Sequence, residues 1–406
     1  MLAASPLASS APSFTDGQFG HLASDPALVR KFAEVVREEY SAAGFRCAPH
    51  RTLDLAMEPR WARLSDNWGE DASLTAEMIV SYIEGFHGDG FGPHSVAAVT
   101  KYFPGGCPVE NGEVFHFSYG RTTNYPGNNF GYHLVPFKAI IAARARAMMP
   151  HYSRIVLRSY RPQRLGGLIT NQNFGQSMPA KACCAEHLSE PERVLKILNA
   201  GADPIGSEHV TDMLVDLIWN GPVSEERIDT SVRRLLREKY PSPSLTTRSS
   251  IRAQPSVARA TSILSSWVPR LSAAPGTPLT NNDTVPLRRA RVAVVDTPDE
   301  ADLALLKVEA PSFPRSGAFQ KRFTSGFSNS TKRRKARQAK IYAAVFATYG
   351  VSPDAFLDVV FGLAKPEGRL PFDLPRFIAA VEAQFEDVPL RYRGPRLLVR
   401  RRKWHA

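Results

Sequence analysis

The fold is decided by Glu58-Pro59-Arg60-Trp61-Ala62-Arg63 and, shortly behind it, Trp68-Gly69-Glu70-Asp71. Outward from these two motifs, residues 26–240 alternate between helix-like and strand-like segments, which is typical of a (β/α) barrel. Apolar residues at helical spacing predict helices, and a short run rich in β-branched and aromatic residues predicts a strand. The expected helices are 27–42, 72–88, 190–200, 210–219 and 225–238, and the expected strand is 96–103.

The composition changes after residue 240. Residues 241–290 are rich in Ser, Pro, Thr and Arg and show no period, which predicts a linker or irregular crossing. Beyond it, 292–295 and 303–306 are expected to be buried strands of a parallel sheet, and 336–349 a helix. We therefore expect four parts, which are a barrel-like domain at 1–240, the linker at 241–290, a shortened α/β sandwich-like domain at 291–390 and a basic tail at 391–406.

The bulk composition fits a globular enzyme of two or three domains, with 406 residues and 43% hydrophobic content. No apolar run approaches the roughly 20 residues that cross a bilayer, so we expect no membrane partner. Residues 1–6 lack the basic and apolar segments of a signal peptide. This predicts a cytoplasmic location, or a secreted one if the natural N-terminus lies upstream. The four cysteines show neither metal-ligand spacing nor a disulfide framework, so we expect no metal and no cofactor; Cys183-Cys184 is interpreted as two small buried residues.

The chain carries a net charge of +12, and the excess lies in two clusters, 332–337 and 391–403. A basic cluster can bind nucleic acid, but it is more often a solvated tail. Nucleic-acid binding through the tail is therefore the weakest alternative, and we expect no nucleic-acid partner.

Three further groups of motifs accompany the first. One contains Thr100-Lys101-Tyr102-Phe103-Pro104-Gly105-Gly106, followed by Tyr119-Gly120-Arg121 and by 125–130. Another comprises 199–203, 208–210 and 221–229, and the last comprises Phe361-Gly362 and 366–372. Together these motifs, over residues 26–240 and 290–390, resemble glycoside hydrolase family 3 in its β-glucosidase branch.

The resemblance implies an α/β fold, with an incomplete (β/α)8 barrel that lacks its first strands, followed by a partial α/β sandwich. It implies that Arg63 and Lys101 hold sugar hydroxyls, a task that suits the rigid donor fork of a guanidinium. Tyr102 stands where the family carries His and can still hydrogen-bond or stack on a sugar, and Arg121 is a further candidate for the same subsite. Outside these motifs, an arginine beside a tryptophan or a single lysine would be interpreted as a surface residue.

The stretch Arg164-Leu165-Gly166-Gly167-Leu168 stands where the family carries Thr/Ser-Asp-Trp-Gly-Leu. Leu165 therefore replaces the aspartate that serves as nucleophile. Retaining glycosidases need two carboxylates about 5–5.5 Å apart, one as nucleophile and one as acid/base. Glu309 is the candidate acid/base, with an exposed structural glutamate as the alternative.

The missing aspartate has a nucleotide-level explanation. Residues 163–166 can be encoded so that the next reading frame gives Ser-Asp-Trp-Gly. In the same way, 391–400 can give Asp-Thr-Ala-Asp-Pro-Val-Phe-Ser-Phe-Gly, and 245–251 can give Tyr-Asn-Pro-Phe-Val-Asp, both of which the family carries at these places. Our hypothesis is that compensating insertions and deletions, from gene decay or sequencing error, altered these segments.

The expected family-level function is hydrolysis of terminal, non-reducing β-D-glucosyl residues with retention, on a β-glucoside or small oligosaccharide. The chain as written is expected to turn over little, because leucine cannot attack an anomeric carbon. The main alternative is a catalytically inactive, sugar-binding relative. The sequence does not indicate an oligomeric state.

Overall fold

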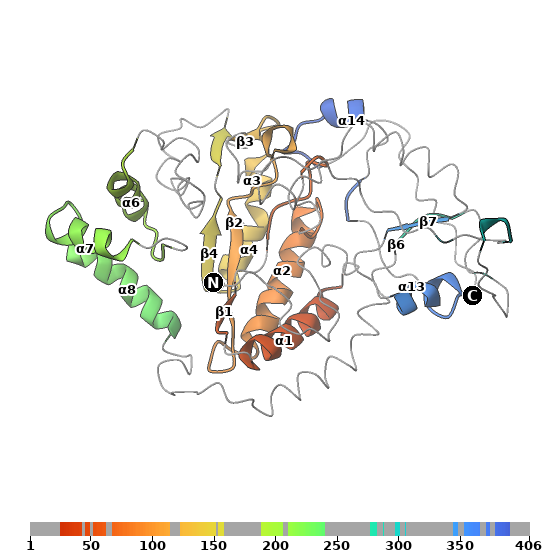
Figure 1. Cartoon of the computed structure of the whole chain (residues 1–406), viewed down its shortest axis with the longest axis horizontal. Helices are drawn as coiled ribbons and strands as arrows, with labels where there is room; N and C mark the ends of the chain where they lie inside the picture. Colours follow the sequence, from red (N-terminus) through yellow and green to blue (C-terminus); the bar gives the residue numbers. More distant parts are fainter. Residues whose placement is uncertain are drawn as a thin grey trace.

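A computed structural model describes the elements of the chain that Figure 1 shows in colour. The described residues are 25–42, 45–48, 52–61, 67–113, 122–151, 153–157, 188–205, 210–239, 277–281, 287, 297–300, 305, 344–347, 353–365, 371–373 and 378–389. Within them, parallel strands alternate with helices, so the fold is α/β.

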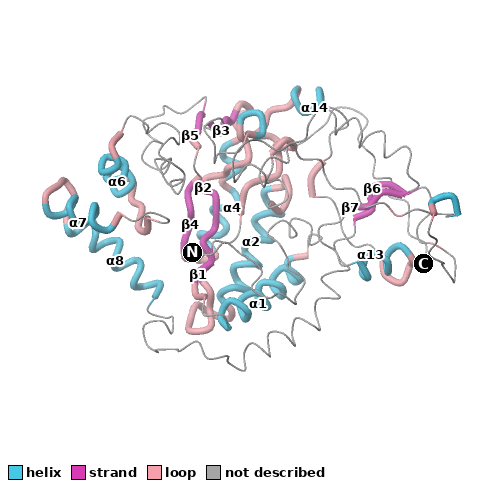
Figure 2. Tube along the Cα trace, viewed as in Figure 1, coloured by secondary structure: helices cyan, strands magenta, loops and turns pink. Residues whose placement is uncertain are grey.

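The first sheet is parallel and three-stranded, with the order β1-β2-β4 (Figure 2). Its strands are β1 (Cys47–Ala48), β2 (Ala97–Phe103) and β4 (Ala147–Pro150). The strand expected at 96–103 is thus confirmed. Most of β2 is buried, which is typical of a parallel strand covered on both faces. Since the strands are parallel, their carboxyl ends meet at one edge of the sheet.

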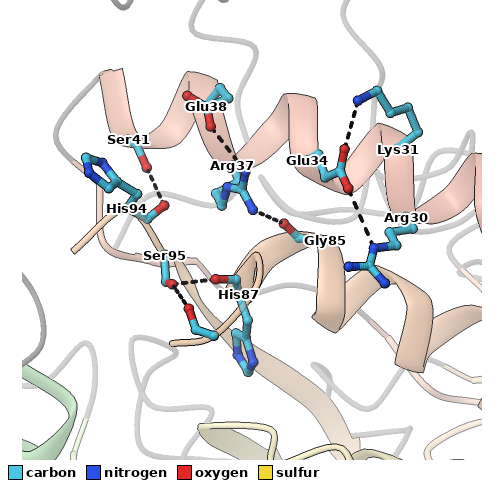
Figure 3. Close-up of polar contacts among 11 residues, drawn as sticks. Arg30, Lys31, Glu34, Arg37, Glu38, Ser41, Gly85, His87, His94 and Ser95 are labelled. Atoms are coloured by element: carbon cyan, nitrogen blue, oxygen red, sulfur yellow. Dashed lines mark hydrogen bonds and ion pairs between the residues drawn. The ribbon is translucent and has the colours of Figure 1, made fainter. Parts of the chain in front are cut away.

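Two helices, α1 (Pro26–Ala42) and α2 (Ala72–His87), share one core cluster with Ala48 and Ala98 of this sheet. Polar side chains such as Arg37 also join the two helices (Figure 3). Gly85 allows the approach, because a Cβ there would lie 2.5 Å from the Arg30 carbonyl oxygen and 2.6 Å from the Ala33 Cβ. The Arg37 guanidinium donates to the Gly85 carbonyl at 3.0 Å. Asp71, the last residue of the opening motif, caps α2 by accepting from the Leu74 amide at 2.9 Å.

A second parallel pair, β3 (Thr122–Tyr125) and β5 (Arg154–Leu157), lies at the carboxyl end of β2 and β4 in the same view (Figure 2). Between β2 and β4 the chain forms the 3-10 turn η3 (Glu110–Gly112) and the helices α3 (Phe130–His133) and α4 (Val135–Ala142). Phe137 and Ile140 of α4 join α1 and α2 in one core cluster. These elements position the loops that follow β2.

Three further helices form their own cluster, α6 (Glu190–Asn199), α7 (Thr211–Trp219) and α8 (Glu225–Lys239). Ser189 and Glu192 form the capping box that opens α6. Arg227 donates to the carbonyls of Leu198 at 2.9 Å and Ala202 at 2.8 Å. These bonds join the motif 221–229 to the motif 199–203 and give the two motifs a structural role. All five helices predicted before residue 240 are therefore confirmed.

Two expectations differ from the structure. Residues 344–347 were expected within a helix, but β7 (Ala344–Ala347) pairs antiparallel with β6 (Thr277–Asn281). A short apolar run fits helix or strand equally well, and here the partner strand decides. β6 itself lies inside the segment expected to be irregular, so that segment contains a regular element.

The remaining described elements are η5 (Pro298–Glu300), α13 (Pro353–Val360) and α14 (Ile378–Glu382). The strands expected at 292–295 and 303–306 lie outside the described residues, apart from Leu305, and so do Cys183-Cys184 and both basic clusters. Among the described helices, none is long and apolar enough to cross a membrane.

Candidate functional site

The candidate site lies at the carboxyl edge of the β1-β2-β4 sheet, where ligands of parallel α/β folds bind. Lys101 and Tyr102 lie near the end of β2, and Thr52 pairs with Lys101 in parallel. The Leu53 amide donates to the Lys101 carbonyl at 2.6 Å, and the His151 amide donates to the Phe103 carbonyl at 2.7 Å. The main chains of three segments therefore meet at this edge.

Asp54 is the buried carboxylate of this edge. It is fully buried, and its Oδ1 accepts a hydrogen bond from the Gly106 amide. Gly106 also packs so closely against the His151 imidazole that a Cβ would collide with the ring. The neighbouring Gly105 has φ +120°, a conformation that favours glycine. The motifs of the sequence did not single out Asp54, although an aspartate inside the apolar run 53–57 is a usable signal.

Lys101 is half-buried, and its Nζ lies 5.4 Å from the centroid of the Tyr102 ring. An ammonium at the carboxyl edge can donate up to three hydrogen bonds to hydroxyl groups. Tyr102 is only 3% exposed and packs in an apolar cluster with Leu55, Trp61 and Cys107. Its ring meets the His151 ring edge-on at 5.9 Å. Most of the Tyr102 side chain is thus part of the core at this edge.

The opening motif is held by an ion pair within itself. Arg60 donates through Nε to Glu58 Oε1 at 2.8 Å and through Nη2 to Glu58 Oε2 at 2.7 Å. Glu58 is buried, and these hydrogen bonds raise the pKa of Arg60. The Cys107 thiol accepts from the amides of Met57 at 3.2 Å and Glu58 at 3.4 Å, and burial raises its pKa. The pair fixes the segment 58–61.

A buried polar cluster supports His151 from the second sheet. The Ser153 amide donates to His151 Nδ1 at 3.2 Å, and the Ser153 hydroxyl lies 2.7 Å from the same atom. Thr123 Oγ1 lies 2.6 Å from the Ser153 hydroxyl oxygen. Because an amide donates to Nδ1, that nitrogen is an acceptor, and a neutral imidazole then carries its proton on Nε2.

The C-terminal part of the chain reaches this edge. The Glu70 amide donates to the Pro371 carbonyl at 3.1 Å, and the Asp373 amide donates to Glu70 Oε1 at 3.3 Å. Gly69 packs against Pro371 with no room for a Cβ, which would lie 2.6 Å from the Pro371 oxygen. Two motifs far apart in sequence, 68–71 and 366–372, are therefore in contact through their described residues.

Of the residues predicted for the site, Lys101 and Tyr102 lie together at the end of β2. The other four, Arg63, Arg121, Leu165 and Glu309, lie outside the described residues, and their roles stay predictions. Across the described part of the chain, no group of three or more His, Cys, Asp or Glu side chains could hold a metal ion. Cys47 and Cys107 are both free thiols.

The sequence matches one family model, described as glycosyl hydrolase family 3 N terminal domain, over residues 17–171. This range contains the motifs at 58–71 and 100–106 and also the stretch around Leu165.

Two fungal proteins are similar over most of the chain. Probable beta-glucosidase C of Aspergillus flavus is 44% identical over 449 aligned positions, covering 91% of this chain and 69% of that protein. Beta-glucosidase C of Emericella nidulans is 43% identical over 449 positions, covering 91% of this chain and 71% of that protein. The aligned span exceeds the 406 residues of this chain, so these relatives carry internal segments that it lacks.

A solved structure gives the same fold. A mutant beta-glucosidase from Listeria innocua in complex with laminaribiose superposes with a TM-score of 0.66 at 18% identity. The superposition covers 90% of this chain and 63% of that chain.

Proposed function

Because the chain belongs to glycosyl hydrolase family 3, whose members at 43–44% identity are β-glucosidases, we propose that it binds a terminal β-D-glucosyl residue at the carboxyl edge of β1-β2-β4. The ligand would be a β-glucoside or small oligosaccharide. The barrel-like domain at 1–240 would supply this site, and the sandwich-like domain at 291–390 would cover it.

The observation that carries the proposal is the position of Lys101. The lysine of the 100–106 motif lies near the end of a buried parallel strand, and its main chain pairs with the segment 52–53 that precedes the buried Asp54. Its ammonium lies over the Tyr102 ring, which packs edge-on against His151. A sugar presents several hydroxyl groups, and a charged donor next to a rigid edge can hold one of them in a fixed direction. Arg63, which follows the Glu58–Arg60 pair closely in sequence, would hold further hydroxyls.

Retaining hydrolysis in this family proceeds in two steps. A carboxylate attacks the anomeric carbon while a carboxylic acid protonates the leaving oxygen, and water then releases the sugar from the carboxylate. Leu165 stands at the position of the attacking carboxylate and has no lone pair. Losing the nucleophile of such a site costs several orders of magnitude in rate, so we propose that this chain retains sugar binding and is impaired in turnover.

The experiment that tests binding is titration calorimetry with gluconolactone. We expect Lys101→Met to weaken binding by about 10-fold or more, since a hydrogen bond from a charged group is lost while the aliphatic stem is kept. Lys138→Met on the exposed face of α4 is the matched control and should bind as the parent does. Equal affinity in the parent and in Lys101→Met would refute the placement of the site.

A separate experiment tests the origin of Leu165. Resequencing the gene and its transcript should show frame changes near the codons for 163–166, 245–251 and 391–400. A verified, unbroken frame that encodes Leu165 would refute a sequencing error and leave Leu165 as a genuine residue of the protein.

A further inference from the structure

We propose that Asp387 is a positioning residue that locks the segment 125–133 and, through it, the turn at Gly105-Gly106 beside Lys101 and Asp54. The turn borders the edge at which sugar binding is proposed, so the part of this inference that concerns a sugar ligand rests on the proposed function. The mechanical coupling itself rests only on contacts between described residues. No sequence motif pointed to Asp387.

Asp387 is fully buried, and both of its carboxylate oxygens and its main-chain carbonyl contact polar groups of the segment 125–133. Its Oδ1 accepts from the Gly127 amide at 2.7 Å, and its Oδ2 accepts from the Asn129 amide at 2.8 Å. Its main-chain carbonyl accepts from Asn129 Nδ2 at 2.9 Å and lies 3.0 Å from His133 Nε2. One residue near the C-terminal end thus makes four polar contacts with a loop more than 250 positions away.

Gly127 shows how closely the two segments approach. A Cβ at this position would lie 2.8 Å from Asp387 Oδ1 and 3.2 Å from Val388 Cγ2. Gly131, in the same segment, has nothing within 4 Å of the corresponding point. The close contact is therefore local to Asp387, and the two glycines form a matched pair for mutation.

The segment 125–133 in turn contacts the turn at Gly105. The Tyr125 hydroxyl donates to the Gly105 carbonyl at 3.0 Å, and the Tyr125 and His133 rings pack edge-on at 5.1 Å. A Cβ at Gly105 would lie 3.3 Å from the His133 Cβ and 3.4 Å from the Tyr125 hydroxyl. A shift of the segment would therefore move Gly105.

The turn ends next to the candidate site. The Gly105 amide donates to the Tyr102 carbonyl at 2.7 Å, and the Gly106 amide donates to Asp54. Hydrogen bonds and packed rings thus lead from Asp387 through the segment 125–133 and the Gly105-Gly106 turn to Asp54 and to Tyr102, the neighbour of Lys101. Figure 1 shows α14, which leads to Asp387, at the same end of the molecule as β3 and α3.

The alternative is that Asp387 only attaches the C-terminal segment to the rest of the fold. The two roles differ in where protection from hydrogen exchange is lost. A simple attachment would affect residues near Asp387 or the whole chain, whereas a positioning role predicts a change that reaches the 104–107 turn and spares α1 and α2.

The test is hydrogen–deuterium exchange of the full chain with Asp387→Asn and Gly127→Ala. The first substitution turns one of the two carboxylate acceptors into an amide donor that faces a main-chain amide, and the second adds a methyl group that pushes the carboxylate away. Both variants should exchange about 10-fold faster or more at 127–133 and at 104–107, with α1 and α2 unchanged. Gly131→Ala should match the parent throughout. Because Gly127→Ala keeps the carboxylate, it decides the question even if Asp387→Asn fails to fold.

Two results would overturn the inference. One is unchanged exchange at 104–107 in both variants, and the other is faster exchange in α1 and α2 by the same factor. Gluconolactone titration then links the coupling to the ligand, and we expect about 10-fold weaker binding in Gly127→Ala than in Gly131→Ala. A parent chain that binds no gluconolactone would refute the proposed function, while the exchange result would still decide the role of Asp387.

Discussion

Acidification should destabilise the fold through His133, which holds the interface between the segment 125–133 and Asp387. The His133 side chain is fully buried, and burial lowers its pKa from 6.5 to about 4, although the Asp387 carbonyl opposes this shift. The neutral ring donates from Nε2 to that carbonyl. Protonation would therefore place a second proton, and a charge, in the core.

The sign follows from the two pKa values. The unfolded chain binds a proton below pH 6.5, and the folded chain binds one only below about pH 4. The stabilising contribution of neutral His133 is thus complete above pH 6.5 and is lost as the pH falls towards 4. A shift of this size corresponds to about 3 kcal/mol of unfolding free energy.

The assay is urea unfolding of the parent and His133→Gln at pH 7.5 and pH 4.5. Glutamine can keep the hydrogen bond to the Asp387 carbonyl and does not titrate. We expect the parent to lose about 2–3 kcal/mol more than the variant between the two pH values. Comparing the two proteins cancels the contribution that other groups make to the pH dependence, including Glu39 and Glu386, whose pKa values are raised by burial. The same pH dependence in both proteins would refute the assignment.

Two further changes test the packing that positions the site. Gly85→Ala should lower the free energy of unfolding by about 1–3 kcal/mol despite the better helix propensity of alanine, because the new Cβ would meet the Arg30 carbonyl. Thermal melting measures the loss, with Gly90→Ala as the control because nothing lies within 4 Å of its Cβ position. A Gly85→Ala variant more stable than the parent would contradict this packing. Arg60→Met leaves the buried Glu58 carboxylate without its guanidinium and should cost about 3–5 kcal/mol in urea unfolding, whereas a loss below about 1 kcal/mol would show that the pair is not needed.

The helices were predictable because their signals are local. Apolar spacing located α1, α2, α6, α7 and α8. The strand at 344–347 was missed, because its four apolar residues carry no period and only the partner strand β6 selects the extended form. The local sequence pattern therefore predicts the longer helices but not the shortest strands.

The candidate site was predictable only in part. The strand that carries Lys101 was predictable from its pattern, so the place of the lysine near the end of that strand followed from the sequence, while its role in sugar binding stays a prediction. The burial of Tyr102 depends on Trp61 and Cys107, which come from other segments. The contacts of Glu70 with Pro371 and of Asp387 with Gly127 join residues hundreds of positions apart. Such contacts follow from tertiary packing and leave no periodic trace in the sequence.

The most direct test of impaired turnover is aryl β-glucoside hydrolysis by the purified chain, beside the Leu165→Asp variant and a variant that restores the whole motif (Arg164→Ser, Leu165→Asp, Gly166→Trp). We expect all three proteins to bind gluconolactone. We also expect the chain as written to hydrolyse the glucoside several orders of magnitude more slowly than an intact family member, and the restored motif to raise the rate. Strong hydrolysis by the chain as written, equal to that of Leu165→Asp, would contradict the role assigned to position 165.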